Sequence, residues 1–269
     1  MDISCKAESG LQLLARLHLR PDLKGLDAVL FENGPNPNDI IEISGDPSSG
    51  KTLMIMQFLV KCLLPSQWLD YSIGGLNAGA VMINTDHHFN LLKLVNLMEA
   101  WLVKSAVVPV TSASKLTNLV IEEIIKDSLK RLTILSCHDS TQLFVTFYSL
   151  ESILSTNTNI SLILLDSISA YYWQDTMVGG LQKMDSYLNR ILKTSCKCIG
   201  EYKVVFIYTK PMYFRSKSSE LPNCSNNGQL THRIILSKIQ DVYCASINTR
   251  HERKMNTYLI EECGICWCH

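Results

Sequence analysis

The sequence predicts an α/β fold in which helices cover both faces of a mainly parallel central sheet. Predicted strands alternate with predicted helices between residues 39 and 210, which is the pattern of βαβ units. One strand, Ile160–Leu165, is an almost unbroken apolar run, as expected for a strand buried on both faces of a parallel sheet. A turn-forming segment, Gly45–Gly50, joins another strand directly to a helix.

The first βαβ unit begins with a strand over Ile40–Ser44. The next helix is expected over Lys51–Leu64, because this stretch contains neither glycine nor proline and Pro65 stops it. The helix is apolar almost all round, which is typical of a helix buried against a sheet. A second strand over Val81–Ile83 then ends near Asp86.

The same patterns place the later elements. Helices are expected around Leu91–Val103 and Leu116–Leu132, from Asp139-Ser140 to about Leu154 and over Leu181–Ile199, with strands at Leu132–Leu135, Ile160–Leu165 and Val204–Tyr208. Beyond Thr209 the character changes. Residues 210–229 form a polar stretch that is interpreted as a flexible loop. The runs Ile234–Ile239 and Val242–Asn248 then predict a short antiparallel C-terminal extension at one edge of the sheet.

Residues 1–38 are interpreted as a helical lead-in to a core that spans residues 39–269 as a single domain. Within this lead-in, the apolar positions of Leu11–Leu19 predict an amphipathic helix that packs on the core, with a docking face for a partner as the alternative. Only 44 residues precede Gly45. We therefore expect no separate helical domain ahead of the core.

The composition is that of a folded chain and excludes several classes of function. Hydrophobic residues make up 46% of the 269 residues, which argues against wholesale disorder. Twenty-five Lys and Arg residues balance twenty-five Asp and Glu residues, so no bulk positive field drives non-specific phosphate binding. The N-terminus predicts no signal peptide, no apolar run is long enough for a membrane helix, and the ten dispersed cysteines are expected to be reduced.

The most specific motif lies between the first strand and the first buried helix. It matches G-x-x-x-x-G-K-[ST] with the residues Gly45, Asp46, Pro47, Ser48, Ser49, Gly50, Lys51 and Thr52. In such a P-loop, backbone N–H groups and a helix N-terminus cradle phosphates. We therefore expect ATP with Mg²⁺ as the cofactor, Lys51 on the β- and γ-phosphates, and Thr52 on the metal ion.

Asp166 closes the most apolar strand and is the second expected Mg²⁺ ligand. A carboxylate at the carboxyl end of a parallel strand opens into the crevice where doubly wound sheets bind ligands. Asp166 is expected to hold Mg²⁺ directly or through a water molecule. The alternative is an ordinary helix cap, because Asp-Ser begins many helices.

Several segments together resemble the RecA-like core of the eukaryotic recombination ATPases. They are the P-loop with the preceding Ile40–Ser44, the strand and turn Leu162–Ala170, and Ile83–Asp86. The chain is thereby identified as a member of the RecA-like recombinase paralogues, and one member is resembled more closely through Ala7–Leu17, Asp86–Phe89 and Tyr148–Ser152. The resemblance covers about residues 7–210 and implies a RecA-like P-loop ATPase core.

The resemblance also implies a cellular role. A subunit of this kind is nuclear and acts in a mediator complex that supports homologous recombination at double-strand breaks and stalled forks. Its partners are other recombinase paralogues, with the D paralogue as the direct one, and indirectly the strand-exchange recombinase. DNA is contacted mainly through the complex, and no membrane is involved.

Two positions depart from the family's catalytic pattern. In the family, the second strand is followed by a glutamate that activates the attacking water. This chain has Asp86 at that position, a degenerate general base that is shorter by one methylene. A displacement of about 1 Å costs on the order of a hundredfold in rate. The family also has an Asn or Gln sensor where this chain has Thr209-Lys210-Pro211, with Lys210 as a possible direct phosphate contact. The resemblance therefore implies ATP binding with weak or absent hydrolysis.

Two segments fall where the family's DNA-contacting loops lie. Trp173–Gly180 lacks the family's usual arginine, and a surface turn explains it equally well. The polar stretch over residues 210–229 contains four candidate DNA contacts that together suit a stacked base and a phosphate, namely Tyr213, Phe214, Arg215 and Lys217.

Other functions stay open at this stage. An autonomous DNA-stimulated ATPase that acts directly on single-stranded DNA would use Asp86 as its base, and a P-loop kinase would need an acceptor motif that is not found. The C-terminal Cys263, Cys266, Cys268 and His269 include a C-x-x-C spacing. Four ligands within seven residues leave little loop to wrap a tetrahedral ion, so we expect no zinc site there.

Overall fold

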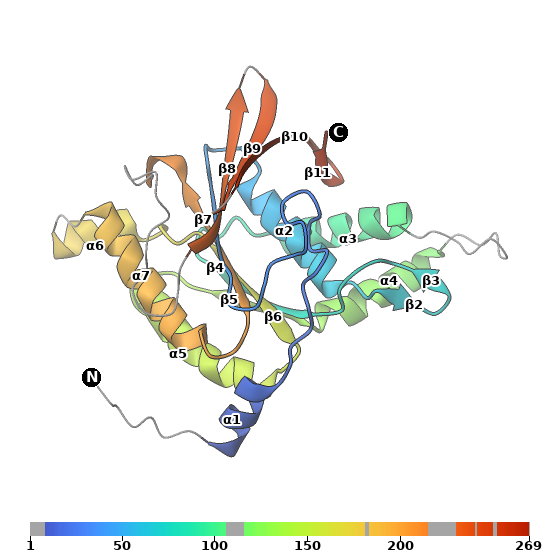
Figure 1. The fold of residues 1–269 in the computed structure, drawn as a ribbon, viewed down its shortest axis with the longest axis horizontal. Coiled ribbons are helices and arrows are strands. Elements are labelled where there is room, and N and C mark those ends of the chain that lie inside the picture. Colours follow the sequence, from blue (N-terminus) through green and yellow to red (C-terminus); the bar gives the residue numbers. More distant parts are fainter. Residues whose placement is uncertain are drawn as a thin grey trace.

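One large sheet divides the protein into two helical layers (Figure 1). The computed structural model describes residues 9–105, 116–180, 183–214, 230–239, 241–249 and 252–268. Within these ranges the strands are β1 (Ile40–Gly45), β2 (Gln67–Trp68), β3 (Tyr71–Ser72), β4 (Gly79–Asn84), β5 (Leu132–Ser136), β6 (Ile160–Asp166), β7 (Val205–Pro211), β8 (Leu230–Ile239), β9 (Val242–Asn248), β10 (Arg253–Glu261) and β11 (Gly264–Trp267). β2 and β3 form a small separate sheet, and the others follow the order β11-β10-β9-β8-β1-β7-β6-β4-β5.

The helices cover both faces of the large sheet. They are α1 (Gly10–Leu17), α2 (Lys51–Leu63), α3 (Leu91–Ser105), α4 (Asn118–Leu129), α5 (Ser140–Thr156), α6 (Tyr172–Gly179) and α7 (Met184–Ile199), with a 3-10 turn, η1 (Met212–Phe214). In Figure 1, α2, α3 and α4 lie on one side of the sheet, and α1, α5, α6 and α7 lie on the other. Each layer closes an apolar core against the sheet. No helix within the described ranges has the length and apolar character needed to cross a membrane.

The central strands are parallel and buried on both faces. β1 runs parallel to both of its neighbours, β7 and β8, and the set continues in parallel through β6, β4 and β5. Every residue of β4 and of β6 is buried, as the apolar run over Ile160–Leu165 predicts. The predicted fold class is therefore confirmed: an α/β fold with a mainly parallel sheet, helices on both faces and an antiparallel C-terminal part.

The C-terminal part is longer than the sequence predicts. The expected hairpin forms as β8 and β9, but β8 also pairs with β1, and β10 and β11 continue the antiparallel part to the sheet edge. β10 opens with Arg253-Lys254 and fully buries only Tyr258, so its alternation of apolar and polar residues is weak. The segment expected as a loop or surface turn, Trp173–Gly180, is largely helical and forms most of α6.

The N-terminal helix leaves most of its apolar face exposed. Leu11, Leu14 and Leu17 of α1 are each more than half exposed, and Ala15 is the residue that α1 buries. The expectation that the apolar face of Leu11–Leu19 packs on the core is therefore wrong. The segment after α1 does supply buried residues to the core below α2, namely Leu23, Leu26, Leu30 and Phe31.

Arg20 fastens this N-terminal segment to the α5 layer. Its guanidinium donates to the carbonyl oxygens of Tyr202 and Ile160, both at 2.6 Å, of Leu154 at 2.8 Å and of Asn157 at 3.1 Å. Burial lowers the pKa of Arg20 to about 10, so the side chain is still charged at neutral pH. Leu154 and Asn157 mark the end of α5, where a positive charge is favoured by the helix dipole.

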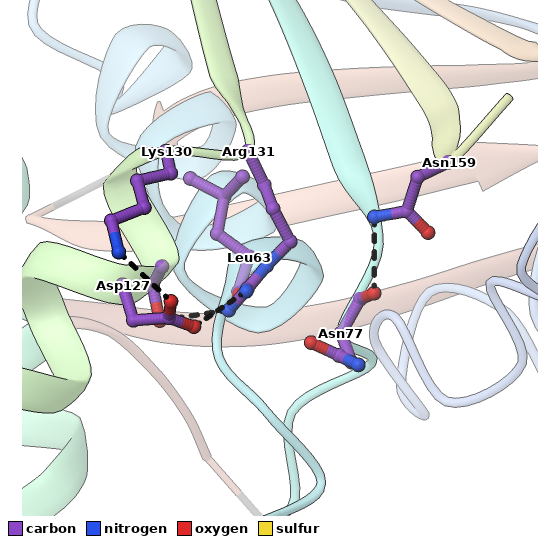
Figure 2. A network of polar contacts seen from close by, with 7 residues as sticks. Leu63, Asn77, Asp127, Lys130, Arg131 and Asn159 are labelled. Atoms are coloured by element: carbon purple, nitrogen blue, oxygen red, sulfur yellow. Dashed lines mark hydrogen bonds and ion pairs between the residues drawn. The ribbon is translucent and has the colours of Figure 1, made fainter. Parts of the chain in front are cut away.

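A second arginine holds the far end of α2 (Figure 2). Arg131 donates to the carbonyl oxygen of Leu63 through Nη2 at 2.8 Å and through Nε at 3.2 Å. Its Nη1 donates to Asp127 Oδ2 at 2.8 Å, so α4 in turn fixes the arginine. The end of α2 opposite the P-loop is thereby capped by a cation, which also suits the helix dipole.

A buried ionic cluster on β1 joins the three central strands. Glu42 Oε2 accepts hydrogen bonds from Lys210 Nζ and Tyr208 Oη, both at 2.9 Å, and Oε1 accepts from Arg233 Nε at 2.9 Å. Glu42 is 2% exposed and Lys210 is 4% exposed. Tyr208 belongs to the core below α5 and α7, so the cluster lies on that side of the sheet.

Glu42→Gln should destabilise the protein strongly. The variant keeps the shape of the side chain but leaves the buried Lys210 and the partly buried Arg233 without a counter-ion. Breaking a buried ion pair in this way costs about 3–5 kcal/mol, and denaturant titration should show that loss in the free energy of unfolding. Glu122→Gln, which removes an exposed pair with Lys126 on α4, is the matched control and should change stability little. Equal, small effects of the two variants would contradict the prediction.

Candidate functional site

The predicted site residues meet at the carboxyl edge of the parallel strands. The P-loop follows β1, Asp86 follows β4, and Asp166 ends β6. β4 and β6 are in register with Asn84 opposite Asp166, and the backbone N–H of Asp86 donates to the carbonyl oxygen of Asp166 at 3.0 Å. This edge is where open α/β sheets bind ligands. The structure therefore brings together the P-loop and both aspartates.

The P-loop has the backbone shape of a phosphate cradle. Ser48 and Gly50 adopt φ angles of +61° and +88°, in the left-handed region, and α2 begins directly afterwards at Lys51. The first amides of a helix have no carbonyl partner within the helix, so they are free to face an anion in the loop. Ser49 Oγ is buried and has no hydrogen-bond partner among the described residues. Such a donor set fits a phosphate group.

Close packing behind the loop requires two of its glycines. A Cβ atom at Gly45 would lie 2.5 Å from the carbonyl oxygen of Leu236, which is a severe clash with backbone. A Cβ atom at Gly50 would lie 3.2 Å from Ile260 Cδ1, and the positive φ already disfavours a side chain there. The two fixed glycines of the motif are thus needed by the fold of this loop.

Lys51 lies over the loop. Its Nζ donates to the carbonyl oxygens of Gly45 at 3.0 Å and of Asp46 at 2.8 Å. Burial lowers the pKa of Lys51, and the carboxylates of Asp166, Asp46 and Asp86 act in the opposite direction. An anionic oxygen is a stronger partner for an ammonium group than a neutral carbonyl. Lys51 is therefore placed to exchange its loop carbonyls for a phosphate.

Asp166 connects the P-loop helix to β7. Thr52 Oγ1 donates to Asp166 Oδ2 at 2.7 Å, and Thr209 Oγ1 donates to Asp166 Oδ1. Asp166 is 3% exposed, and Thr209 is completely buried. The predicted metal pair, Thr52 and Asp166, is thus in direct contact, and its hydroxyl and carboxylate oxygens suit a hard cation such as Mg²⁺. Thr209 holds the carboxylate in place through its other oxygen.

Asp86 combines partial burial with a nearby like charge. Burial raises the pKa of Asp86, and the carboxylate of Asp166 raises it further. A hydrogen bond with Ser167 and the charges of His88 and Lys51 lower it, but they do not cancel the rise. A carboxylate with a raised pKa is a more effective general base than an ordinary aspartate.

Lys210 does not reach the P-loop. Its ammonium is paired with Glu42 at 2.9 Å inside the sheet. Successive residues of a strand point to opposite faces, so Thr209 meets Asp166 on the α2 side while Lys210 points to the other side. The interpretation of Lys210 as a phosphate contact is therefore wrong.

The C-terminal strands support the P-loop, a role that no sequence motif reveals. Tyr258 Oη of β10 donates to the carbonyl oxygen of Ser49 at 2.7 Å. On α2, the amide group of Gln57 pairs twice with the backbone of Ile265 of β11, at 2.9 and 3.0 Å. Tyr258 and Ile265 lie 209 and 208 positions from their partners, so local patterns carry no signal for these contacts.

The four DNA-contact candidates are described only in part. Tyr213 is 61% exposed on η1, directly after β7, and the backbone of Phe214 ends that turn. Arg215 and Lys217 lie outside the described residues, together with residues 215–229 of the predicted flexible loop. Contact of these residues with DNA stays a prediction.

Comparison with known proteins identifies one relative along almost the whole chain and another along two thirds of it. The DNA repair protein XRCC2 of Mus musculus is 30% identical over 292 aligned positions, which cover 98% of this chain and 98% of the mouse protein. A DNA repair protein XRCC2 homolog of Arabidopsis thaliana is 26% identical over 207 positions, which cover 66% of this chain and 56% of that protein. No family model matches the chain. The predicted resemblance to one member of the recombinase paralogues is confirmed by the first of these matches.

Asp86→Asn should raise the melting temperature of the ligand-free protein at neutral pH. Because the pKa of Asp86 is raised in the folded state, its ionised form is held at a free-energy cost that a neutral amide avoids. The gain should shrink as the pH falls through the raised pKa, since wild-type Asp86 then takes up a proton in the folded state. Thermal scans from neutral to acidic pH measure both effects. An equal gain from Asp46→Asn, which neutralises an exposed carboxylate of the same loop, would contradict this explanation.

Tyr258→Phe should loosen the P-loop without unfolding the protein. The variant removes the hydrogen bond to the Ser49 carbonyl, a loss of about 1 kcal/mol that lowers the melting temperature by about 2–4 °C. Hydrogen exchange at the amides of residues 45–52 should become faster. Tyr148→Phe, which changes an exposed tyrosine on α5, is the control. Unchanged exchange in the P-loop of Tyr258→Phe would show that the C-terminal strands do not support it.

Proposed function

The chain belongs to the XRCC2 family of DNA repair proteins, and from this premise we propose that it is a recombinase-paralogue subunit of a mediator complex for homologous recombination. In this role it binds ATP with Mg²⁺ and hydrolyses ATP weakly or not at all. One observation carries the proposal: an intact P-loop whose Thr52 contacts Asp166, beside altered residues, Asp86 and Thr209, at the hydrolytic and sensor positions.

The P-loop supports ATP as the ligand. The free amides at the start of α2 and the hydroxyl of Ser49 would bind the phosphates, and Lys51 would leave the carbonyls of Gly45 and Asp46 to meet them. The carboxylates that act on Lys51 keep its positive charge at this edge of the sheet.

Thr52 and Asp166 would hold Mg²⁺ beside these phosphates. The chemistry that the ion would supply there is neutralisation of phosphate charge. Thr52 Oγ1 donates a hydrogen bond to Asp166 Oδ2. To hold the ion, Thr52 would turn this oxygen toward it, and Asp166 would bind the ion directly or through a water molecule. The hydrogen bond from Thr209 keeps the carboxylate oriented during this exchange.

Weak hydrolysis follows from the residues at two positions. Asp86 reaches one methylene less far than the family's glutamate, and a displacement of about 1 Å costs on the order of a hundredfold in rate. The hydroxyl of Thr209 donates its hydrogen bond to Asp166. Thr209 therefore does not replace the side-chain amide of the family's Asn or Gln sensor, which connects the γ-phosphate to the DNA loop. Bound ATP is therefore expected to act as a structural ligand.

A second candidate function is an autonomous DNA-stimulated ATPase. The raised pKa of Asp86 favours it, because a general base works best when its pKa approaches the working pH. Phosphate release is to be measured with and without single-stranded DNA, on wild type and Asp86→Ala. Turnover that DNA stimulates and that Asp86→Ala abolishes would establish this second function and overturn the structural role of ATP.

The proposed partners are other recombinase paralogues in the nucleus. The D paralogue is the direct partner, the strand-exchange recombinase is reached indirectly, and DNA is contacted mainly through the complex, with Tyr213 as the described candidate contact. The exposed leucines of α1, Leu11, Leu14 and Leu17, support an apolar docking face, because the core does not use them.

Affinity capture of the tagged chain from nuclear extract tests the subunit role. Nuclease treatment removes DNA bridging, and mass spectrometry should then recover other recombinase paralogues in amounts close to that of the tagged chain. A variant with Leu14→Ser and Leu17→Ser on the exposed face of α1 should recover less of its direct partner. Recovery of the chain alone would contradict the proposal.

Lys51→Ala should weaken ATP binding by roughly 10–100-fold, since a hydrogen bond to a charged group contributes about 1.5–3 kcal/mol. Titration with a fluorescent ATP analogue measures this loss, and Lys126→Ala on the surface of α4 is the control. Partner assembly should persist in Lys51→Ala. Unchanged ATP affinity would contradict the assignment of the site, whereas loss of assembly would show that the nucleotide organises the interface.

A further inference from the structure

The turn between β10 and β11 brings three metal-ligating side chains together. Cys263 Sγ and Cys266 Sγ each lie 3.3 Å from Glu261 Oε2, and the two sulfur atoms are 3.9 Å apart. Among the His, Cys, Asp and Glu side chains in the described part of the chain, these three lie close enough together to share one ion. All three residues are partly or fully exposed, so an ion can reach them from solvent.

The three distances match the edges of a zinc tetrahedron. With Zn–S bonds of about 2.3 Å and Zn–O bonds of about 2.0–2.2 Å, a tetrahedral ion separates two sulfur ligands by about 3.8 Å and a sulfur from an oxygen by about 3.6 Å. The three separations, 3.9, 3.3 and 3.3 Å, each agree with these values to about 0.3 Å. A metal ion therefore fits between the ligand atoms with little rearrangement.

The fold arranges these ligands before any ion binds. Glu261 pairs with Gly264 in a tight hairpin, and Leu259 pairs with Cys266, so Glu261 and Cys266 share one face of the two strands. Gly264 turns the chain with a φ of +122°, and Gln57 holds the backbone of Ile265 at two points. This rigidity lowers the entropic cost of forming a metal site.

We propose that Glu261, Cys263 and Cys266 form a zinc site that fastens the C-terminal hairpin. Two thiolates and one carboxylate suit Zn²⁺, and each thiol releases its proton to solvent as its sulfur binds the ion. A water molecule takes the fourth position on the exposed side. From the sequence we expect no zinc site, because the four ligands considered there are Cys263, Cys266, Cys268 and His269. In the structure, Glu261 at the end of β10 is the third ligand beside Cys263 and Cys266.

Metal titration of the reduced full-length chain tests the site. Zn²⁺ is titrated against a chromophoric chelator, with Mg²⁺ in excess to occupy oxygen sites such as the P-loop, and Co²⁺ reports thiolate ligation through its sulfur charge-transfer band. We expect one equivalent of Zn²⁺. Cys263→Ser and Cys266→Ser should each weaken binding by roughly 100-fold or more, and Glu261→Gln by roughly 10–100-fold, on the scale of lost metal-site partners.

Cys268→Ser is the matched control, because Cys268 is an exposed cysteine two positions beyond the cluster. It should keep the affinity of the wild type, and thermal scans should show that all variants are folded. The proposal is overturned if the reduced wild type binds no Zn²⁺ or gives no cobalt–sulfur band. It is also overturned if Cys268→Ser loses as much affinity as Cys266→Ser, or if Cys263 and Cys266 form a disulfide that persists under reducing conditions.

Discussion

The buried carboxylate of Asp166 is the interaction on which the site depends. It ends β6 and accepts hydrogen bonds from Thr52 on the P-loop helix and from Thr209 on β7. A buried carboxylate is stable only when its oxygens are paired, so both hydroxyls belong to the fold as well as to the site. The same contacts fix the start of α2, and thereby the P-loop, against the strand that carries the acid.

β7 keeps two polar systems on opposite faces of one sheet. Thr209 points toward Asp166, whereas Tyr208 and Lys210 point toward Glu42. Since Glu42 neutralises Lys210 inside the sheet, Lys210 adds no positive charge to the P-loop, whereas Lys51 does. The cluster around Glu42 joins β1 to both neighbouring strands, so it stabilises the frame that positions the loop without taking part in its chemistry.

The sequence predicts the parts of the protein whose signal is local. The alternation of strands and helices, the P-loop and its pairing with Asp166 depend on short patterns, and the structure agrees with them. The structure departs where partners are distant in the chain or where the periodicity is weak. The apolar face of α1 has the pattern of a core helix but lies exposed, and the support of Ser49 by Tyr258 joins residues 209 positions apart. Lys210 shows the same limit, because only the register with β1 reveals Glu42 as its partner.

The C-terminal strands make the P-loop part of a larger cooperative unit. Tyr258 holds the loop itself, while Ile265 holds Gln57 two turns into α2, so the loop and the β10–β11 hairpin are ordered by shared contacts. A ligand that orders the hairpin therefore lowers the entropic cost of ordering the loop, and binding linkage makes the effect reciprocal. A nucleotide in the P-loop should then protect the amides of β11 from exchange, and an ion on Glu261, Cys263 and Cys266 should protect those of the loop. The two sites need no contact for this coupling, because β10, β11 and α2 carry it through buried side chains such as Ile265 and Tyr258.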